Sequence, residues 1–144
     1  MGKRVKRTRN AETWTESQYW GFVRSSLRRS FRYWKPALKA KMAARHKYNG
    51  KNKRQKWEYK CAKCGGWFKD KEIQIDHINP VGSLRCGADI EGFLERLTSE
   101  QGFQILCKTC HSEKTAIDRE NIKRGGKNNE NGEVFSKRQA INSC

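Results

Sequence analysis

Apolar side chains near the start of the chain recur at helical spacing and predict an amphipathic helix. Thr15, with Gln18 three positions later, has the pattern of a capping box, which is typical of a helix start. Beyond it, an apolar seam falls within about 80° of arc at 100° per residue. The seam consists of Trp20, Val23, Leu27, Phe31 and Trp34. Such a seam is more often packed in a core than used to stack on bases.

A basic stripe occupies the adjoining arc of the same helix and is the better candidate for contact with DNA. It consists of Arg24, Arg28, Arg32 and Lys35. Pro36 interrupts or restarts the helix, and residues 37–47 are predicted to form a second, shorter helix. The basic, glycine-containing run 49–53 is predicted to be a turn or linker at a boundary between two parts of the chain.

From residue 55 onward the hydrophobic period shortens to two, which predicts strands. Trp57 and Tyr59 alternate with charged residues, and Ile73, Ile75 and His77 alternate with polar ones. The Gly65–Gly66 pair lies between these two segments and suits the tight turn of a hairpin that joins them.

Two further helices are expected in the second half of the chain. Residues 89–99 predict a short helix with four apolar side chains directed inward, namely Ile90, Phe93, Leu94 and Leu97. Another helix should begin at Cys107 and run to about Lys123, where a pair of glycines ends it. The polar tail that follows, residues 126–144, is expected to be flexible.

Charge is concentrated at one end of the 144-residue chain, which carries a formal net charge of +17. Residues 1–60 hold 19 basic and 3 acidic side chains, a net charge of +16, and the remainder is nearly neutral. This excess favours a polyanionic partner, either nucleic acid or an acidic membrane surface. We therefore expect a disordered basic arm over residues 1–12, a basic helical DNA-binding extension over 13–49, and a core over 50–125.

No segment has the long apolar run of a membrane span or the apolar stretch of a signal peptide. An intracellular protein without a membrane partner is therefore expected. The sequence leaves the oligomeric state open, with a monomer favoured.

Four of the six cysteines form two C-x2-C pairs separated by 42 residues, at a spacing that suits two metal-binding knuckles. They are Cys61, Cys64, Cys107 and Cys110. Cysteines in a reducing compartment are more often metal ligands than disulfides. Four thiolates favour a closed tetrahedral zinc site, whose role is structural because it has no open position for substrate.

A second group of chemically capable residues is arranged around these knuckles. It comprises Asp76 and His77 at the end of a predicted strand, followed by His111 and Lys114 in the last helix. The knuckle at Cys107 should hold that helix close to the hairpin that carries Asp76. Neighbouring strand residues point to opposite faces, so Asp76 and His77 can serve one reaction only if the strand ends there.

The segments Ile75-Asp-His-Ile-Asn-Pro80 and Phe103-Gln-Ile-Leu-Cys-Lys-Thr-Cys-His-Ser-Glu-Lys-Thr115 resemble the ββα-metal core of HNH endonucleases. The subgroup with two C-x2-C pairs, frequent in bacteriophages and mobile introns, is the most similar. The resemblance covers about residues 57–122. It implies an α+β fold in which a ββα-metal core with a four-cysteine zinc site follows the basic helical extension.

The resemblance also implies a chemistry. His77 would be the general base that activates water, while Asp76 and His111 would hold one divalent ion, Mg²⁺, Mn²⁺ or Ni²⁺, for phosphodiester hydrolysis in DNA. Lys114 and the basic stripe would contact the DNA. If the protein is phage-encoded, the bacterial cytoplasm is its expected location. The alternatives are a zinc-stapled nucleic-acid-binding module with a degenerate active site, or a structural partner that uses the basic helix on another protein.

One position departs from the family pattern. Five residues before Cys107, where the family usually has an asparagine that ties the loop to the hairpin, this chain has Gly102. Gln101 and Asn79 are the candidates to replace that asparagine. The departure bears on the orientation of the base and is the main support for the binding-module alternative.

Overall fold

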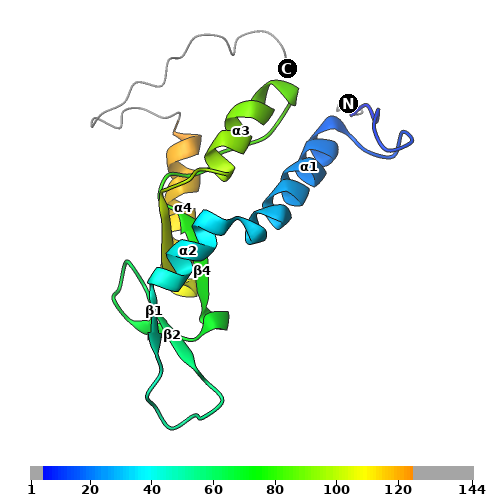
Figure 1. The fold of residues 1–144 in the computed structure, drawn as a ribbon. Coiled ribbons are helices and arrows are strands. Elements are labelled where there is room, and N and C mark those ends of the chain that lie inside the picture. The colour runs from blue at the N-terminus through cyan, green and yellow to red at the C-terminus, as the bar shows by residue number, and fades with distance from the viewer. Residues whose placement is uncertain (1–4, 125–144) are drawn as a thin grey trace. The chain divides into compact units, whose positions relative to one another are not determined.

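The structure is a computed structural model that describes residues 5–124 (Figure 1). This part of the chain is mixed α and β, with helices and small antiparallel sheets. It divides into two compact units: unit 1 holds residues 5–34 and 81–99, and unit 2 holds residues 35–80 and 100–124. This division differs from the one expected at residue 50. The predicted flexible tail and residues 1–4 lie outside the described residues.

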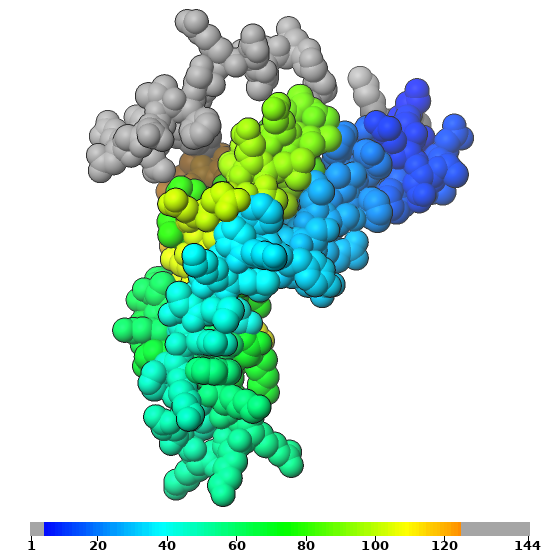
Figure 2. All heavy atoms as spheres, in the orientation of Figure 1, coloured from blue at the N-terminus to red at the C-terminus, as the bar shows by residue number. Residues whose placement is uncertain are grey.

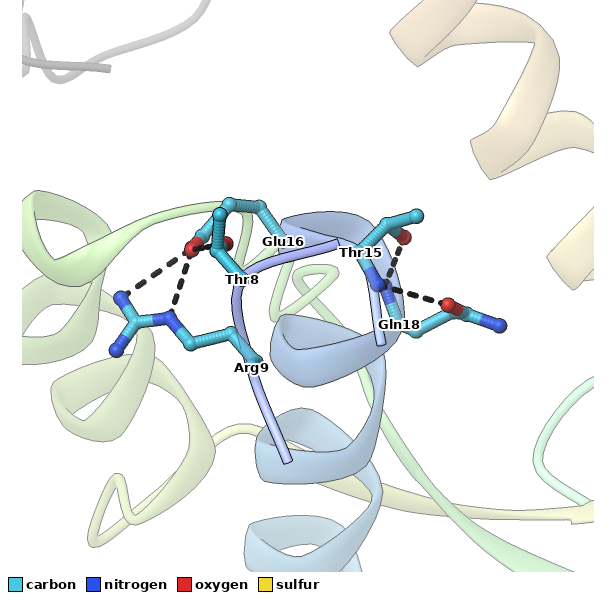
Figure 3. Close-up of polar contacts among 5 residues, drawn as sticks. All are labelled: Thr8, Arg9, Thr15, Glu16 and Gln18. Carbon is cyan, nitrogen blue, oxygen red and sulfur yellow. Dashed lines mark hydrogen bonds and ion pairs between the residues drawn. The ribbon is translucent and has the colours of Figure 1, made fainter. Parts of the chain in front are cut away.

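Unit 1 begins with α1 (Glu16–Ser30), which starts where the capping box predicts. The Gln18 backbone N–H donates to the Thr15 hydroxyl oxygen at 3.3 Å, and the Thr15 N–H donates to the Gln18 amide oxygen at 2.8 Å (Figure 3). Each cap residue thus satisfies an N–H group that has no partner within the helix. The 3₁₀ helix η1 (Phe31–Tyr33) follows α1.

The described part of the basic arm is folded against the first turn of α1. The Arg9 guanidinium lies 2.7 Å from the Glu16 carboxylate, and the Thr8 hydroxyl donates to the same carboxylate at 3.0 Å (Figure 3). These bonds lower the pKa of Glu16, chiefly through the Arg9 contact. Of the residues 1–12 for which the sequence predicts disorder, Thr8 and Arg9 therefore contact α1, and Glu16 neutralises one of the arm's charges.

The apolar seam of α1 packs in a core, as predicted. Trp20, Val23, Leu27 and Phe31 cover a cluster of four buried residues, Val81, Leu84, Phe93 and Leu97. Two of these come from α3 (Ile90–Leu97), which follows the 3₁₀ helix η3 (Gly87–Asp89) and lies where the sequence predicts a short helix. Trp34 also joins this unit, because its indole N–H donates to the Ser99 carbonyl at 2.8 Å.

Unit 2 starts with α2 (Lys35–Ala43) and a three-stranded antiparallel sheet in the order β1 (Arg45–Lys47), β2 (Trp57–Lys60), β3 (Trp67–Phe68). The prediction of one helix over residues 37–47 is wrong at its end. Residues 45–47 pair with β2 over the full length of β1, and this non-local partner outweighs the local helical pattern.

A second sheet carries the candidate site. Strand β4 (Ile73–His77) follows the 3₁₀ helix η2 (Asp70–Glu72) and pairs antiparallel with β5 (Phe103–Cys107), after which the chain enters α4 (Lys108–Lys123). The predicted hairpin between residues 57–60 and 73–77 is wrong. The turn at Gly65–Gly66 joins β2 to β3 instead, and the partner of β4 is β5.

The interior of unit 2 is small. Tyr59, Ile73 and Ile105 form one buried cluster, and Leu106 is buried with three cysteines in another. Helix α2 packs against β5. Within residues 5–124, none of the helices has the length and apolar character needed to cross a membrane.

Candidate functional site

The two C-x2-C pairs come together, as their spacing predicts. The four cysteine sulfur atoms lie within 4.8 Å of one another. Cys61 and Cys64 occupy the turn between β2 and β3, whereas Cys107 ends β5 and Cys110 lies in the first turn of α4. Cys64 is exposed and the other three are buried. The turn is tied to β5 because the Ala62 N–H donates to the Ile105 carbonyl at 2.8 Å.

Backbone N–H groups are directed at the sulfur atoms. The Cys107 N–H donates to the Cys61 sulfur at 3.3 Å, and the Cys110 N–H donates to the Cys107 sulfur at 3.5 Å. The pKa of the Cys61 thiol, which burial alone would raise, is lowered to about 6 by backbone hydrogen bonds. The pKa of Cys110 is raised to about 12, first by its contact with Cys107 and then by burial. Four adjacent thiolates therefore need a cation to coexist.

This donor set fits one structural zinc ion. Four sulfur atoms about 2.3 Å from a tetrahedral zinc lie about 3.8 Å apart, so small side-chain adjustments would close the cluster on an ion. Soft thiolate ligands favour zinc over Mg²⁺ or Ca²⁺. Among the residues that the structure describes, this is the only cluster of three or more potential metal ligands.

Asp76 lies at the centre of a second polar group, on the β4 and β5 side of α4. Its carboxylate accepts a hydrogen bond from the Gln104 amide at 2.9 Å, across the strand pair in which Asp76 is opposite Gln104. The other carboxylate oxygen lies 3.7 Å from His111 Nε2. The Asp76 side chain is only 13% exposed, so these neighbours supply the polar contacts that water would otherwise make. Gln104 was not predicted as a site residue.

Lys114 belongs to this polar group. Its ammonium lies 3.3 Å from Asp76 and 2.7 Å from Asp118, a residue that the sequence analysis did not single out. Burial lowers the pKa of Lys114, but the two carboxylates outweigh burial and the net shift is upward. Lys114 therefore stays charged between Asp76 and Asp118, whereas the sequence predicted a contact with DNA.

His77 is the last residue of β4, as the sequence required for a shared role with Asp76. Its ring meets the ring of its cross-strand neighbour Phe103 edge to face, with 5.0 Å between the ring centroids. The side chain is half-buried. Asp76 and His111 are therefore brought together, whereas His77 is held at the end of β4 by its aromatic contact with Phe103.

Gly102, the position at which the sequence departs from the pattern that it resembles, links two backbone segments. Its carbonyl accepts a hydrogen bond at 2.8 Å from the N–H of Ile78, the residue after His77. Gly102 has a φ of +86°, in the region that favours glycine. The loop that leads into β5 is thus tied directly to the end of β4.

The predicted basic stripe is distributed over both units. Arg24, Arg28 and Arg32 belong to unit 1, and Lys35 begins α2 in unit 2. Arg28 lies within 3.5 Å of the Gly82 carbonyl and 5.8 Å from the Phe93 ring centroid, so it is partly engaged in its own unit. Arg32 and Lys35 are exposed.

Comparisons of the chain with protein-family models, with curated proteins and with solved structures found no match.

Proposed function

We propose that this protein is a metal-dependent DNA endonuclease of the HNH type, in which unit 2 carries the active site and a structural zinc ion stabilises it. The support is the placement of Asp76 and His111 on a β4–β5–α4 arrangement that the zinc ligands flank. The sequence resemblance implies the same arrangement of two strands and a helix.

The separation of Asp76 and His111 is the observation that carries the proposal. The Asp76 carboxylate oxygen and His111 Nε2 lie 3.7 Å apart, close enough for both atoms to bind one divalent ion after a small side-chain adjustment. A divalent ion held by one carboxylate and one imidazole keeps several positions for water and a phosphate oxygen, and would stabilise the charge that develops on the phosphate and on the leaving 3′ oxygen.

His77 takes the role of general base. Its imidazole accepts a proton from a water molecule, whose oxygen then attacks the phosphorus in line with the 3′ oxygen that leaves. The edge contact with Phe103 restricts the ring, and the Gly102 link fixes the backbone just beyond it. Gln104 holds the Asp76 carboxylate in place by donating to one of its oxygens.

A second candidate is a zinc-stapled nucleic-acid-binding module without catalysis, and Lys114 favours it. The Lys114 ammonium lies 3.3 Å from Asp76 and so already compensates the carboxylate charge. In a nuclease, a divalent ion would have to displace the Lys114 ammonium from Asp76 or bind the carboxylate beside it. The two candidates therefore differ in whether added Mg²⁺ or Mn²⁺ causes the protein to cleave DNA.

Plasmid cleavage separates the candidates. Supercoiled plasmid is incubated at saturating protein with Mg²⁺, with Mn²⁺ or without added divalent ions, so that no chelator removes the zinc. We expect nicked or linear product only with added metal. His77→Ala should slow cleavage by about 10²- to 10⁴-fold, the contribution of a general base.

His46→Ala is the matched control, because His46 is an exposed histidine of β1 that contacts Glu58 and lies in neither cluster. It should cleave at the wild-type rate. A wild-type protein that binds plasmid and never cleaves it with either metal would favour the binding module. Equal rates for wild type and His77→Ala would remove His77 from the mechanism.

A further inference from the structure

Strands β1 and β2 and the loop that joins them form a strongly basic ribbon. Residues 45–60 contain seven Lys and Arg against a single acidic residue, Glu58. In Figure 1 the strands and their loop extend beyond α2, and in Figure 2 side chains of this segment project from the same end of unit 2. Among the described residues, none of the ion pairs involves Lys47, Lys53, Arg54 or Lys56.

Hydrogen bonds tie the loop to the two strands of the ribbon. The Tyr48 N–H donates to the Lys56 carbonyl at 3.0 Å, which extends the β1–β2 ladder by one step. Within the loop, the Asn52 side chain accepts from the Arg54 N–H at 3.1 Å. Residues 49–53 lie within unit 2, and these hydrogen bonds hold the backbone that carries the basic side chains.

Trp57 lies exposed in the middle of this charge. It is 40% exposed, although tryptophan side chains in folded proteins are on average highly buried. The Arg45 guanidinium lies 4.2 Å from the Trp57 ring centroid, and Lys47 is the cross-strand neighbour of Trp57 on the same face. Tyr59, two residues further along the same face of β2, is buried in the core. This face of the sheet is therefore covered at Tyr59 and open to solvent, among basic side chains, at Trp57.

Two open hollows meet at Trp57. One, of about 660 Å³, is lined by Arg54, Lys56 and Trp57 among others, and the second, of about 370 Å³, by Lys47, Lys53, Lys56 and Trp57. Asp70 also lines the first hollow, but its carboxylate is paired with Lys41. The positive charge around Trp57 is thus largely uncompensated.

We infer that this ribbon surface, defined as Arg45, Lys47, Lys53, Arg54, Lys56 and Trp57, binds an unpaired nucleic-acid strand, with a base stacked on Trp57 and the phosphates along the lysines. Basic grooves with exposed aromatic rings are the common means of binding single strands. Charge alone would fit a duplex equally well. The exposed indole decides between them, because bases stacked inside a duplex do not offer their faces.

This inference goes beyond the proposed function and is tested without cleavage. A labelled oligothymidylate of about 12 nucleotides is titrated with the full chain, without added divalent ions, and fluorescence anisotropy reports binding. The same titration uses an abasic oligonucleotide and a duplex of equal length. Failure of the active site would leave these measurements unchanged, so the two proposals fail separately.

Trp57→Leu should weaken binding to oligothymidylate by about 5- to 150-fold, the range for loss of one base stack, and change binding to the abasic strand less than twofold. Trp57→Phe should recover part of the loss. Trp67→Leu is the matched control, because Trp67 is also exposed, at 48%, but pairs with Lys60 on the opposite face of the sheet.

The lysines give a second measurement that does not depend on Trp57. Lys53→Gln and Lys56→Gln should each reduce the slope of log affinity against log salt by about 0.7, the value for one contact with a single-strand phosphate. Zinc content and circular dichroism check the fold of each variant. The inference is overturned if Trp57→Leu weakens duplex binding as much as single-strand binding, or if the lysine variants leave the salt slope unchanged.

Discussion

The two compact units of this chain have different kinds of interior, and each is stabilised in its own way. The interior of unit 1 is made of aromatic and aliphatic side chains, with Phe93 and Leu84 fully buried. In unit 2, one of the two buried clusters consists of Leu106 and three cysteines whose sulfur atoms, with that of Cys64, could hold a metal ion. The comparison teaches that an ion bound by the four cysteines could fix β5 and α4 beside polar groups, such as Asp76, that an apolar core would exclude.

Removal of the metal should have the largest effect, and it should be confined to unit 2. We expect one zinc per chain, and Cys107→Ser should abolish zinc binding and unfold β5 and α4. Structural zinc in small domains supplies roughly 10 kcal/mol or more of apparent binding energy, which is also folding energy. Metal analysis and amide hydrogen exchange measure this. Protection should be lost at Ile105 and Leu106 and retained at Phe93.

Thr109→Ser serves as the control for that substitution, because Thr109 is exposed between the two cysteines of the second pair. The Thr109→Ser protein should keep its zinc and the protection of the Ile105 and Leu106 amides from hydrogen exchange. A soluble, folded preparation that contains no zinc and still protects Ile105 would show that the four thiols do not need a metal.

Phe93→Ala makes the opposite test, on unit 1. The Phe93 side chain is fully buried, so its truncation should destabilise the protein by about 3 to 5 kcal/mol through lost burial and a cavity. Denaturant unfolding followed by circular dichroism measures the change. Zinc content should stay at one per chain. Leu94→Ala, at a half-buried position of the same helix, should cost less, and loss of zinc from Phe93→Ala would contradict the separation of the two units.

Local sequence patterns predicted the structure correctly where the interacting residues are close together in the sequence. Thr15 and Gln18 are three residues apart, so the start of α1 could be predicted, and the internal spacing of each C-x2-C pair predicted the metal cluster. The end of β4 at His77 was expected for the same reason, because Pro80 follows closely.

Pairings between distant segments could not be predicted in this way. The partner of β4 is separated from it by residues 78–102, and nothing in the alternation of residues 73–77 identifies β5. Gln104 was missed as a support of Asp76 because their contact exists only once that register is known. Asp118 could have been found, since it is four residues from Lys114 on one helix face.

A smaller effect is expected at the start of unit 1, where a single capping residue can be removed. Thr15→Ala should destabilise the protein by about 1 kcal/mol, because the Gln18 N–H loses its acceptor. The midpoint of urea unfolding measures the difference. Thr15→Ser retains the hydroxyl and should recover most of it. An unchanged midpoint for Thr15→Ala would mean that water replaces the capping hydrogen bond without cost.

The smallest effect is expected at Gly102 in unit 2. An added Cβ would meet no atom within 4 Å there, so the backbone conformation is the only obstacle to a side chain. Asparagine tolerates positive φ better than most residues, and Gly102→Asn should change stability by less than about 0.5 kcal/mol and plasmid cleavage by less than twofold. Gly102→Val, with a β-branched side chain at a φ of +86°, should cost about 1 to 2 kcal/mol.

The reason for near neutrality is that a backbone hydrogen bond already links the loop at Gly102 to the end of β4. The Gly102 carbonyl accepts from Ile78 N–H at 2.8 Å, and this bond does not depend on the side chain at position 102. The added amide therefore has little left to restore at the end of β4. A Gly102→Asn protein that keeps its zinc and its fold but cleaves much faster would show that the main-chain link holds His77 poorly. A Gly102→Asn protein that keeps its zinc and its fold but loses cleavage would show that the alignment of this segment with the HNH pattern is wrong.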